Sequence, residues 1–285
     1  MAGSVSTPSI PGLVITKSGK IVSPNTKLAM LCWAVPGLGK TNLAGSLDRL
    51  TQKFENGRRM LYIPVEASEG GGAVTIRKLN VPMFIPKDLN ELMKTLGSLR
   101  NDKEFAGVVL DSATEMVNQH VKPNALRYPA RENTATRVAG VPNRSDYQVM
   151  GELTSQVFRQ LLMMTTHHNP EYRKHVIVTA TVREKEENER IAWRGPELPG
   201  RMAGEACAQF QVVGTIKTKT EVVGGKRQVA RYLCTSTDGV EALKDRFELF
   251  PPEVKLCKNY TYGSDGEDLC SIWEKYWIPA MKEAA

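Results

Sequence analysis

Residues 34–41, Ala-Val-Pro-Gly-Leu-Gly-Lys-Thr, combine the residue types that bind a phosphate chain. The glycines permit a tight turn whose backbone N–H groups converge on phosphate oxygens. Lys40 has the length and charge to reach the β- and γ-phosphates, and the Thr41 hydroxyl is a ligand for Mg²⁺. The run therefore predicts a nucleotide-phosphate site. Its predicted binding residues are Pro36, Gly37, Leu38, Gly39, Lys40, Thr41 and Asn42.

The segments on either side of this run fit the same interpretation. An apolar run, 28–33, precedes it and an amphipathic segment, 42–50, follows it. This is the strand–turn–helix order that a phosphate-binding loop requires, and the helix N-terminus adds partial positive charge. Ala34 stands where G-x-x-x-x-G-K-[ST] expects its first glycine, which the loop accommodates if φ at Ala34 is negative. The alternative, a chance Gly-Lys-Thr in a surface turn, does not account for the flanking strand and helix.

A buried strand is predicted to deliver a second acidic group to the same site. The apolar run 106–110 ends in Asp111 and Ser112. Ligands of open α/β sheets bind at the carboxyl ends of the strands, and an aspartate there helps to position Mg²⁺ through its water shell. We therefore predict that Thr41 and Asp111 hold the metal. The alternative is a strand that simply ends in a polar turn.

Polar side chains at two further strand ends are candidates for handling the attacking water. Glu66 ends the run 60–65, and Glu69 follows in a glycine-rich stretch. We prefer Glu66 because residues at strand ends are held more rigidly, although both carboxylates are also consistent with solvated loop acids. Thr179 and Thr181 are candidate sensors of the γ-phosphate, and β-branched packing residues are the alternative. The predicted catalytic residues are Lys40, Glu66 and Asp111.

Apolar runs and helical patterns alternate along most of the chain. The strand-like runs are 29–33, 60–65, 107–110 and 175–180, and the helical stretches are 42–54, 88–99 and 147–164. Strands separated by helices indicate a parallel sheet covered on both faces. Later, 209–220 and 229–236 flank a glycine turn, which is typical of a β-hairpin, and 268–282 is helical. The sequence thus predicts an α/β fold with a mainly parallel central sheet flanked by helices, plus a C-terminal β-hairpin and short helix.

Composition limits the class of protein and its surroundings. Of 285 residues, 41% are hydrophobic and 24% charged, and the formal net charge is +7. This basic excess fits a nucleic-acid partner without requiring one. Five cysteines without a C-x-x-C pair argue against a disulfide framework or a structural zinc site and favour a reducing cytoplasm. No apolar run is long enough to cross a membrane, and 1–24 lacks a secretory signal, so no membrane partner is expected.

We divide the chain by composition into three parts. Residues 1–24, rich in Ser, Thr, Gly and Pro, are expected to be a flexible arm. Residues 25–240 carry the alternating strands and helices and are expected to form the core. Residues 241–285 are expected to be a C-terminal extension.

Two basic stretches are candidates for binding a nucleic acid. The stretch 117–145 is predicted to be irregular, and Glu132 is its one acid among the basic and aromatic candidates that follow. Basic residues with an aromatic suit single-stranded nucleic acid, and a solvated loop is the alternative. In the predicted loop 183–196, the charged first half reads as a solvated face, whereas Trp193 beside Arg194 suggests stacking or core packing. The candidates are Lys122, Arg127, Tyr128, Arg131, Arg137, Arg144, Trp193 and Arg194.

Lys217 and Lys219 are candidates for reaching a neighbouring subunit. They occupy alternate positions of a predicted strand and therefore project from one face. Such cations could act on a neighbour's nucleotide as an arginine finger does. An exposed strand face is the alternative.

Together these motifs resemble the RecA-like ATPases of bacteriophages, which are single-domain relatives of RecA implicated in recombination and single-strand annealing. The resemblance covers about residues 25–235 and is carried by 34–41, 66–72, 108–112, 176–183 and 199–204. It implies a phosphate-binding role for Gly39, Lys40 and Thr41, a Mg²⁺ role for Asp111 and a water-activating role for Glu66. Ala34 and Pro64 depart from the family pattern. In such proteins the DNA-facing loops follow the third and fourth strands, which correspond here to 107–110 and 175–180, so the resemblance places them at 117–145 and 183–201.

The resemblance implies an enzyme, an ATP phosphohydrolase with Mg²⁺ as cofactor. We expect slow hydrolysis coupled to single-stranded DNA in a homo-oligomer, either filament or ring, with a single-strand-binding protein as a further candidate partner. If the protein is phage-encoded, it would act in the host bacterial cytoplasm. One alternative is a nucleotide-dependent switch or assembly ATPase that binds protein rather than DNA. A small-molecule kinase is less consistent, because no acceptor-site motif or lid pattern is present.

Overall fold

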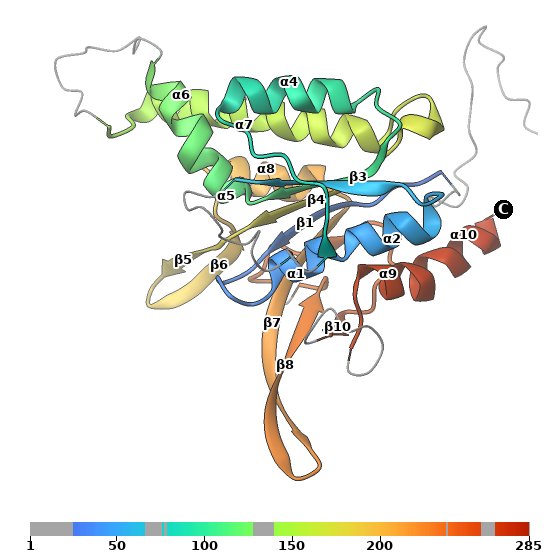
Figure 1. The fold of residues 1–285 in the computed structure, drawn as a ribbon. Helices are drawn as coiled ribbons and strands as arrows, with labels where there is room; N and C mark the ends of the chain where they lie inside the picture. Colours follow the sequence, from blue (N-terminus) through green and yellow to red (C-terminus); the bar gives the residue numbers. More distant parts are fainter. Residues whose placement is uncertain are drawn as a thin grey trace, which may run out of the picture.

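The predicted strands form one central sheet in the computed structural model, which describes residues 25–65, 76, 79–127, 140–237, 239–257 and 266–284 (Figure 1). The strand order is β10-β8-β7-β1-β4-β3-β2, and β9 pairs with β7. Neighbours from β2 to β7 pair in parallel, whereas β8, β9 and β10 pair antiparallel. The strands are β1 (Ala29–Trp33), β2 (Arg59–Pro64), β3 (Phe105–Asp111), β4 (His175–Ala180), β7 (Val212–Val223), β8 (Lys226–Cys234), β9 (Lys244–Asp245) and β10 (Glu253–Leu256).

Helices cover both faces of the sheet, because its central strands are apolar on both sides. In β1, Leu31 and Trp33 join the cluster that holds α4, α7 and α8, whereas Met30 and Cys32 join the one that holds α1, α2 and α9. The first face carries α4 (Leu89–Leu99), α5 (Ala113–Met116), α6 (Lys122–Arg127), α7 (Arg144–Thr165) and α8 (Met202–Gln209). The second carries α1 (Lys40–Gly45), α2 (Leu47–Phe54), α9 (Leu269–Ile272) and α10 (Ile278–Ala284). The predicted α/β fold is confirmed.

Polar side chains fix the points at which several helices begin. Asn143 accepts a hydrogen bond from the Asp146 N–H at 2.9 Å, and the Asp146 carboxylate accepts one from the Asn143 N–H at 2.9 Å, which forms a capping box for α7. The Asp88 carboxylate accepts a hydrogen bond from the Glu91 N–H at 2.8 Å and is the N-cap of α4. These caps satisfy backbone N–H groups that have no partner within the helix.

The stretch 117–145 is not irregular throughout, so that prediction was wrong for its described residues. A π-helical segment, Val117–Val121, leads into α6, and Arg144 already begins α7. Val121 and Ala125 recur at helical spacing and are fully buried, and this packing outweighs the polar residues around them. Residues 128–139 lie outside the described part of the chain.

The predicted loop 183–196 is also wrong, because this segment forms a hairpin. Strands β5 (Val182–Glu187) and β6 (Arg190–Pro196) pair antiparallel in a separate two-stranded sheet. The turn between them places Asn188 and Glu189 at φ 52° and 61°, as a two-residue hairpin turn with twist-matched geometry requires. The exposed residues of β5 show no apolar alternation, so backbone pairing forms a strand that hydropathy does not indicate.

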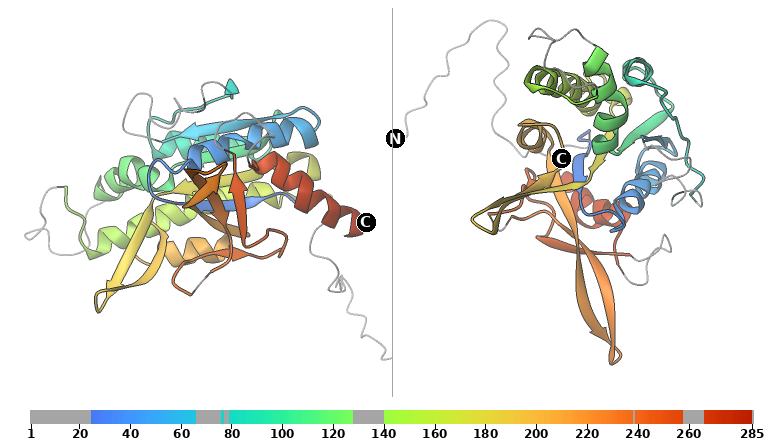
Figure 2. Two further views of the ribbon diagram at one scale, coloured as in Figure 1. Left: turned by 90° about the horizontal axis from the view of Figure 1, so that it is seen from below. Right: turned by 90° about the vertical axis from the view of Figure 1, so that its left-hand side faces the viewer.

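The predicted glycine-turn hairpin is present and is formed by β7 and β8. Its turn consists of Gly224 and Gly225, at φ 58° and 76°, which are values that L side chains rarely adopt. The hairpin extends well beyond the rest of the described chain (Figures 1 and 2). Strand β7 begins later than predicted, because α8 extends to Gln209.

Residues after 240 join the same sheet and core as those before it. Strands β9 and β10 extend the central sheet, and Trp273 and Trp277 stack at 4.4 Å between ring centroids within the core beside α2. Residues 1–24, the predicted arm, lie outside the described residues. Among the helices that are described, none combines the length and the apolar character needed to cross a bilayer.

A buried ionic cluster joins the end of α2 to the beginnings of β1 and β4. Glu55 Oε1 accepts from Lys27 Nζ and from His175 Nε2, the latter at 3.0 Å, and Glu55 Oε2 lies 3.1 Å from Arg58 Nη2. His175 Nδ1 accepts from the Leu28 N–H at 3.1 Å, which places the imidazole proton on Nε2. Burial opposes ionisation of Glu55, but His175 and Lys27 outweigh it and lower the pKa of the carboxyl to about 2.

Candidate active site

The glycine-containing loop 34–39 joins β1 to α1 at the carboxyl end of the parallel strands. Gly37 and Gly39 have φ of 82° and 96°, so both positions need glycine. Ala34 is not among the residues with positive φ, as expected, and its N–H donates to the Ala180 carbonyl at 3.2 Å. The alanine therefore fits the turn where the motif expects glycine.

Lys40 lies against its own loop. Its Nζ donates to the carbonyl oxygens of Ala34 at 2.8 Å and Val35 at 3.2 Å. The Leu43 N–H donates to the Gly39 carbonyl at 3.0 Å, which begins the helix directly behind the loop. The ammonium is thus held within the turn that its backbone neighbours form, where a phosphate group would meet both the amides and the charge.

Asp111 is the meeting point of four elements. The residue is 3% exposed and lies at the end of β3. Thr41 Oγ1 from α1 donates to Oδ2 at 2.6 Å, the Tyr62 hydroxyl from β2 donates to the same oxygen, and the Thr179 hydroxyl from β4 donates to Oδ1. These hydroxyl groups satisfy a buried carboxylate that would otherwise be costly to desolvate. The peptide bond between Asp111 and Ser112 is cis.

The donor set beside the loop suits Mg²⁺. Thr41 offers a hydroxyl and Asp111 a carboxylate, 2.6 Å apart, and Mg²⁺ prefers such oxygen ligands with water and phosphate oxygens completing its octahedron. Among the described residues no group of three or more His, Cys, Asp or Glu is arranged to hold a metal ion. Two protein oxygens leave the rest of an octahedral shell to water and phosphate oxygens, so Thr41 and Asp111 fit a Mg²⁺ ion that binds together with a phosphate chain.

The other predicted polar residues lie at different distances from this centre. Thr179 contacts Asp111, as described above. Thr181 lies just beyond β4, where its hydroxyl donates to Glu197 Oε2 at 2.5 Å and its N–H donates to Thr114 Oγ1 at 3.0 Å. Glu66 and Glu69 lie outside the described residues, so the water-orienting role stays a prediction.

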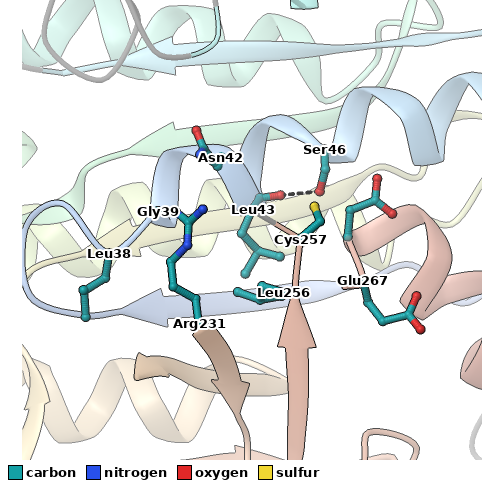
Figure 3. A pocket seen from close by; sticks show the side chains of 10 residues that line it. Leu38, Gly39, Asn42, Leu43, Ser46, Arg231, Leu256, Cys257 and Glu267 are labelled. Carbon is teal, nitrogen blue, oxygen red and sulfur yellow. Dashed lines mark hydrogen bonds between the residues drawn. The ribbon is translucent and has the colours of Figure 1, made fainter. Parts of the chain in front are cut away.

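Arg231 is a site residue that sequence reasoning missed. It lies on β8, and its guanidinium rests on the loop: a Cβ atom added to Gly39 would come within 2.4 Å of Arg231 Nη1 (Figure 3). A crevice continues from there along α1, lined by Asn42, Leu43, Ser46, Leu256, Cys257 and Glu267. The two-residue turn sets the register that pairs Arg231 with Thr218, but no sequence signal shows that this face of the hairpin meets the loop.

The predicted nucleic-acid residues are distributed over several elements. Lys122 and Arg127 lie on α6 and Arg144 begins α7, whereas Tyr128, Arg131 and Arg137 lie outside the described residues. Trp193 packs against the hydrophobic cluster that holds α4, α7 and α8, and Lys185 Nζ lies 5.2 Å from the centroid of its ring. Arg194 Nε donates to Glu184 Oε1 at 2.7 Å, so the side chains of both residues are engaged by their own hairpin or core.

Lys217 and Lys219 each pair with a carboxylate of the same chain. Lys217 Nζ lies 2.5 Å from Glu241 Oε2, and Lys219 Nζ pairs with Glu253 Oε2. Action on a neighbouring subunit stays a prediction, and it would require these pairs to open.

Comparisons with known proteins assign no family to the chain. No protein-family model matches it, and no curated protein matches it. Among solved structures, it is similar to the flagellar accessory protein FlaH from Methanocaldococcus jannaschii, with 10% sequence identity, coverage of 82% of this chain and 85% of that chain, and a TM-score of 0.38. A similarity at this level assigns neither a family nor an activity.

Proposed function

We propose that this protein is a RecA-like P-loop ATPase that binds and hydrolyses ATP with Mg²⁺. The observation that carries the proposal is the placement of Thr41 against Asp111, 2.6 Å apart, beside a loop in which Gly37 and Gly39 both adopt positive φ. A glycine-turned loop, a lysine, a hydroxyl and a strand-end carboxylate are the parts that phosphoryl transfer to water requires in this class of enzyme.

Each part has a distinct role in the proposed reaction. The loop amides would bind the phosphate oxygens, and Lys40 would turn from the Ala34 and Val35 carbonyls to the β- and γ-phosphates. Thr41 and Asp111 would hold Mg²⁺, which neutralises charge on the phosphate chain. Thr179, hydrogen-bonded to Asp111, would keep that carboxylate oriented. Glu66 remains the predicted residue for positioning water.

Turnover of ATP tests this function. Wild-type protein is expected to release phosphate from ATP in the presence of Mg²⁺, and Lys40→Ala is expected to remove that release. Lys94→Ala, an exposed lysine on α4, is the matched control and should leave it unchanged. Equal turnover by wild type and Lys40→Ala would place the reaction elsewhere.

We further propose single-stranded DNA as the partner, supported by an arginine-containing groove between α7 and α8. The groove has a volume of about 630 Å³ and is lined by Arg144, Tyr147, Arg159 and Arg201, together with Glu152 and Glu205. Glu152 lies 3.9 Å from Arg159 and Glu205 lies 2.9 Å from Arg201, so Arg144 supplies the excess positive charge. Tyr147 is 50% exposed. An exposed aromatic ring near arginines suits single-stranded DNA, because a base can stack on the ring while the arginines contact the phosphates. The groove lies beside the predicted DNA-facing residue Arg144.

DNA binding is tested by its salt dependence and by its effect on ATP turnover. Binding to an oligonucleotide should weaken steeply between about 50 and 200 mM salt, because phosphate contacts release counterions. Arg144→Ala with Arg159→Ala should weaken it while ATP binding stays unchanged. Stimulation of turnover by single strands would link the two activities, and absence of binding at low salt would remove the DNA half of the proposal.

A nucleotide-dependent assembly ATPase that binds protein is the second candidate, favoured by the tip of the β7–β8 hairpin. There Val222, Val223 and Val229 are 68%, 54% and 60% exposed. Val222 and Val229 project from the same face of the hairpin and Val223 from the other, and grouped exposed apolar side chains mark protein-binding surfaces more often than isolated ones do. This candidate predicts self-association or protein binding through the tip, with or without DNA.

A further inference from the structure

We propose that Arg231 binds the phosphate chain of the nucleotide from within the same subunit. This inference rests on the proposed ATPase function and assigns a second positive charge to its site. The role differs from that predicted for Lys217 and Lys219, which would act on a neighbour.

The position of Arg231 is fixed by strand pairing on both sides. On β8 it lies opposite Thr218 of β7 and opposite Leu256 of β10. Its guanidinium is pressed against Gly39, where any side chain would come within 2.4 Å of Nη1. Gly39 itself is at φ 96°, a backbone conformation that favours glycine.

The alternation of side chains along the hairpin selects Arg231 over the two lysines. Residues paired across an antiparallel hairpin project to the same side, so Thr218 and Arg231 share one face. Lys217 and Lys219 occupy the alternate positions of β7 and project to the opposite face, where they pair with Glu241 and Glu253. The face that meets the glycine loop thus carries the arginine.

The charges around Arg231 favour a phosphate at the loop end of the crevice. Glu267 and Asp268 line the far end, and each already lies near a cation: Glu267 Oε1 is 3.4 Å from Lys275 Nζ, and Asp268 Oδ2 is 3.1 Å from Arg49 Nη1. At the loop end, the Arg231 guanidinium lies against Gly39, the residue that precedes Lys40, and the Lys40 ammonium is hydrogen-bonded to the Ala34 carbonyl of the same loop. A guanidinium offers forked N–H donors that match phosphate oxygens.

Equilibrium nucleotide binding by charge-altered variants tests the proposal. Arg231→Met keeps the length of the side chain and removes its charge, and Arg231→Lys keeps the charge and removes the fork. We expect ATP to bind Arg231→Met at least about tenfold more weakly than wild type, as loss of a charge-assisted hydrogen bond implies, and Arg231→Lys to fall between them. Arg227→Met is the matched control, since Arg227 lies on the same strand and face, exposed near the tip, and should bind ATP as wild type does.

The outcomes separate this inference from the function on which it rests. Failure of wild type to bind ATP would overturn both. ATP binding by wild type and Arg231→Met with equal affinity, and loss only in Lys40→Ala, would overturn the role of Arg231 and leave the ATPase intact. Melting temperatures measured without nucleotide control for folding, because a residue that merely supports the loop would lower stability in Arg231→Lys as well as in Arg231→Met.

Mixed subunits distinguish action within a chain from action between chains. An equimolar mixture of Arg231→Met and Lys40→Ala should show no more ATP turnover than the two proteins measured separately, because neither chain then carries a complete site. Recovery of turnover on mixing would show that Arg231 serves a neighbour's nucleotide and would overturn the proposal.

Discussion

At the scale of single residues, Asp111 connects the end of β3 to the helix that follows the glycine loop. Three hydroxyl groups converge on the carboxylate of this buried residue, and one of them, that of Thr41, lies at the start of α1 directly after the glycine loop. These hydrogen bonds hold the carboxylate beside the loop, where the proposed function requires it to help position Mg²⁺.

Replacing this carboxylate should uncouple the metal from the nucleotide. In the presence of Mg²⁺, Asp111→Asn is expected to bind ATP and to turn it over about 10- to 100-fold less well than wild type, which is the usual cost of losing a group that orients a metal site. Binding measured in EDTA should change little, since the loop and Lys40 remain. Titrations with and without Mg²⁺ check this, and an equal loss in both would indicate damage to the fold.

The site could be predicted from sequence where a motif fixes both residue type and spacing. Thr41 and Asp111 follow from the Gly-Lys-Thr run and from the strand that ends in aspartate, and they do meet. Tyr62 and Arg231 could not be predicted, because each lies within a strand and its role depends on which neighbour that strand acquires. The turn sets which residues pair across a hairpin, but the residues that each face of a strand contacts depend on how the whole sheet packs.

At the scale of elements, strands made of buried apolar runs could be predicted from the sequence. Strands and helices whose residues are mostly polar could not. Strands β1 and β4 match their predicted bounds because every residue in them is buried, which leaves a continuous apolar run. The β5–β6 hairpin is exposed and charged, so backbone pairing forms it without a hydrophobic signal. In 117–127, buried residues at helical spacing are hidden among polar ones.

The ionic cluster at the end of α2 makes a prediction about stability. Glu55→Gln should lower the free energy of unfolding by about 3 kcal/mol, because it leaves Lys27 buried without its carboxylate. Glu274→Gln, which breaks the exposed pair with Lys53, is the control and should cost no more than about 1 kcal/mol. Urea unfolding at pH 7 measures both, and equal effects would contradict the account.

The same cluster predicts how stability depends on pH. The pKa of Glu55 is about 2 in the folded chain, below its ordinary value of about 4.3, so its contribution is complete above pH ~4.3 and is lost as pH falls toward 2. Burial lowers the pKa of His175, which acts in the same direction below about pH 6.5. Wild type should therefore lose more stability than Glu55→Gln between pH 5 and pH 2.5, in urea titrations at each pH.

At the scale of the whole molecule, the β7–β8 hairpin extends from the edge of the sheet at which the glycine loop lies. The glycine loop and Asp111 lie at the carboxyl ends of the parallel strands, and the antiparallel β7–β8 hairpin extends from the same sheet past the body (Figure 2). The strand order beside the hairpin brings Arg231 to the loop. One element thus contacts the glycine loop at its base and presents valines at its tip.

The tip makes a prediction about assembly. Serine at Val222, Val223 and Val229 should change the free energy of unfolding by no more than about 0.5 kcal/mol per site, because these side chains are exposed. If subunits associate through the tip, the variant should sediment as a smaller species than wild type in the presence of ATP. Ile85→Ser, which removes an apolar side chain that is 71% exposed outside the hairpin, is the control.

We expect the loop around Lys40 to bind a nucleotide through its phosphates. Calorimetric titration of the full chain with ATP and Mg²⁺, beside Lys40→Ala, tests it most directly. We predict one ATP bound per chain in wild type and a loss of that binding in Lys40→Ala, whose melting temperature without nucleotide should match wild type. Absence of binding to wild type, or equal affinity in the two proteins, would contradict the account.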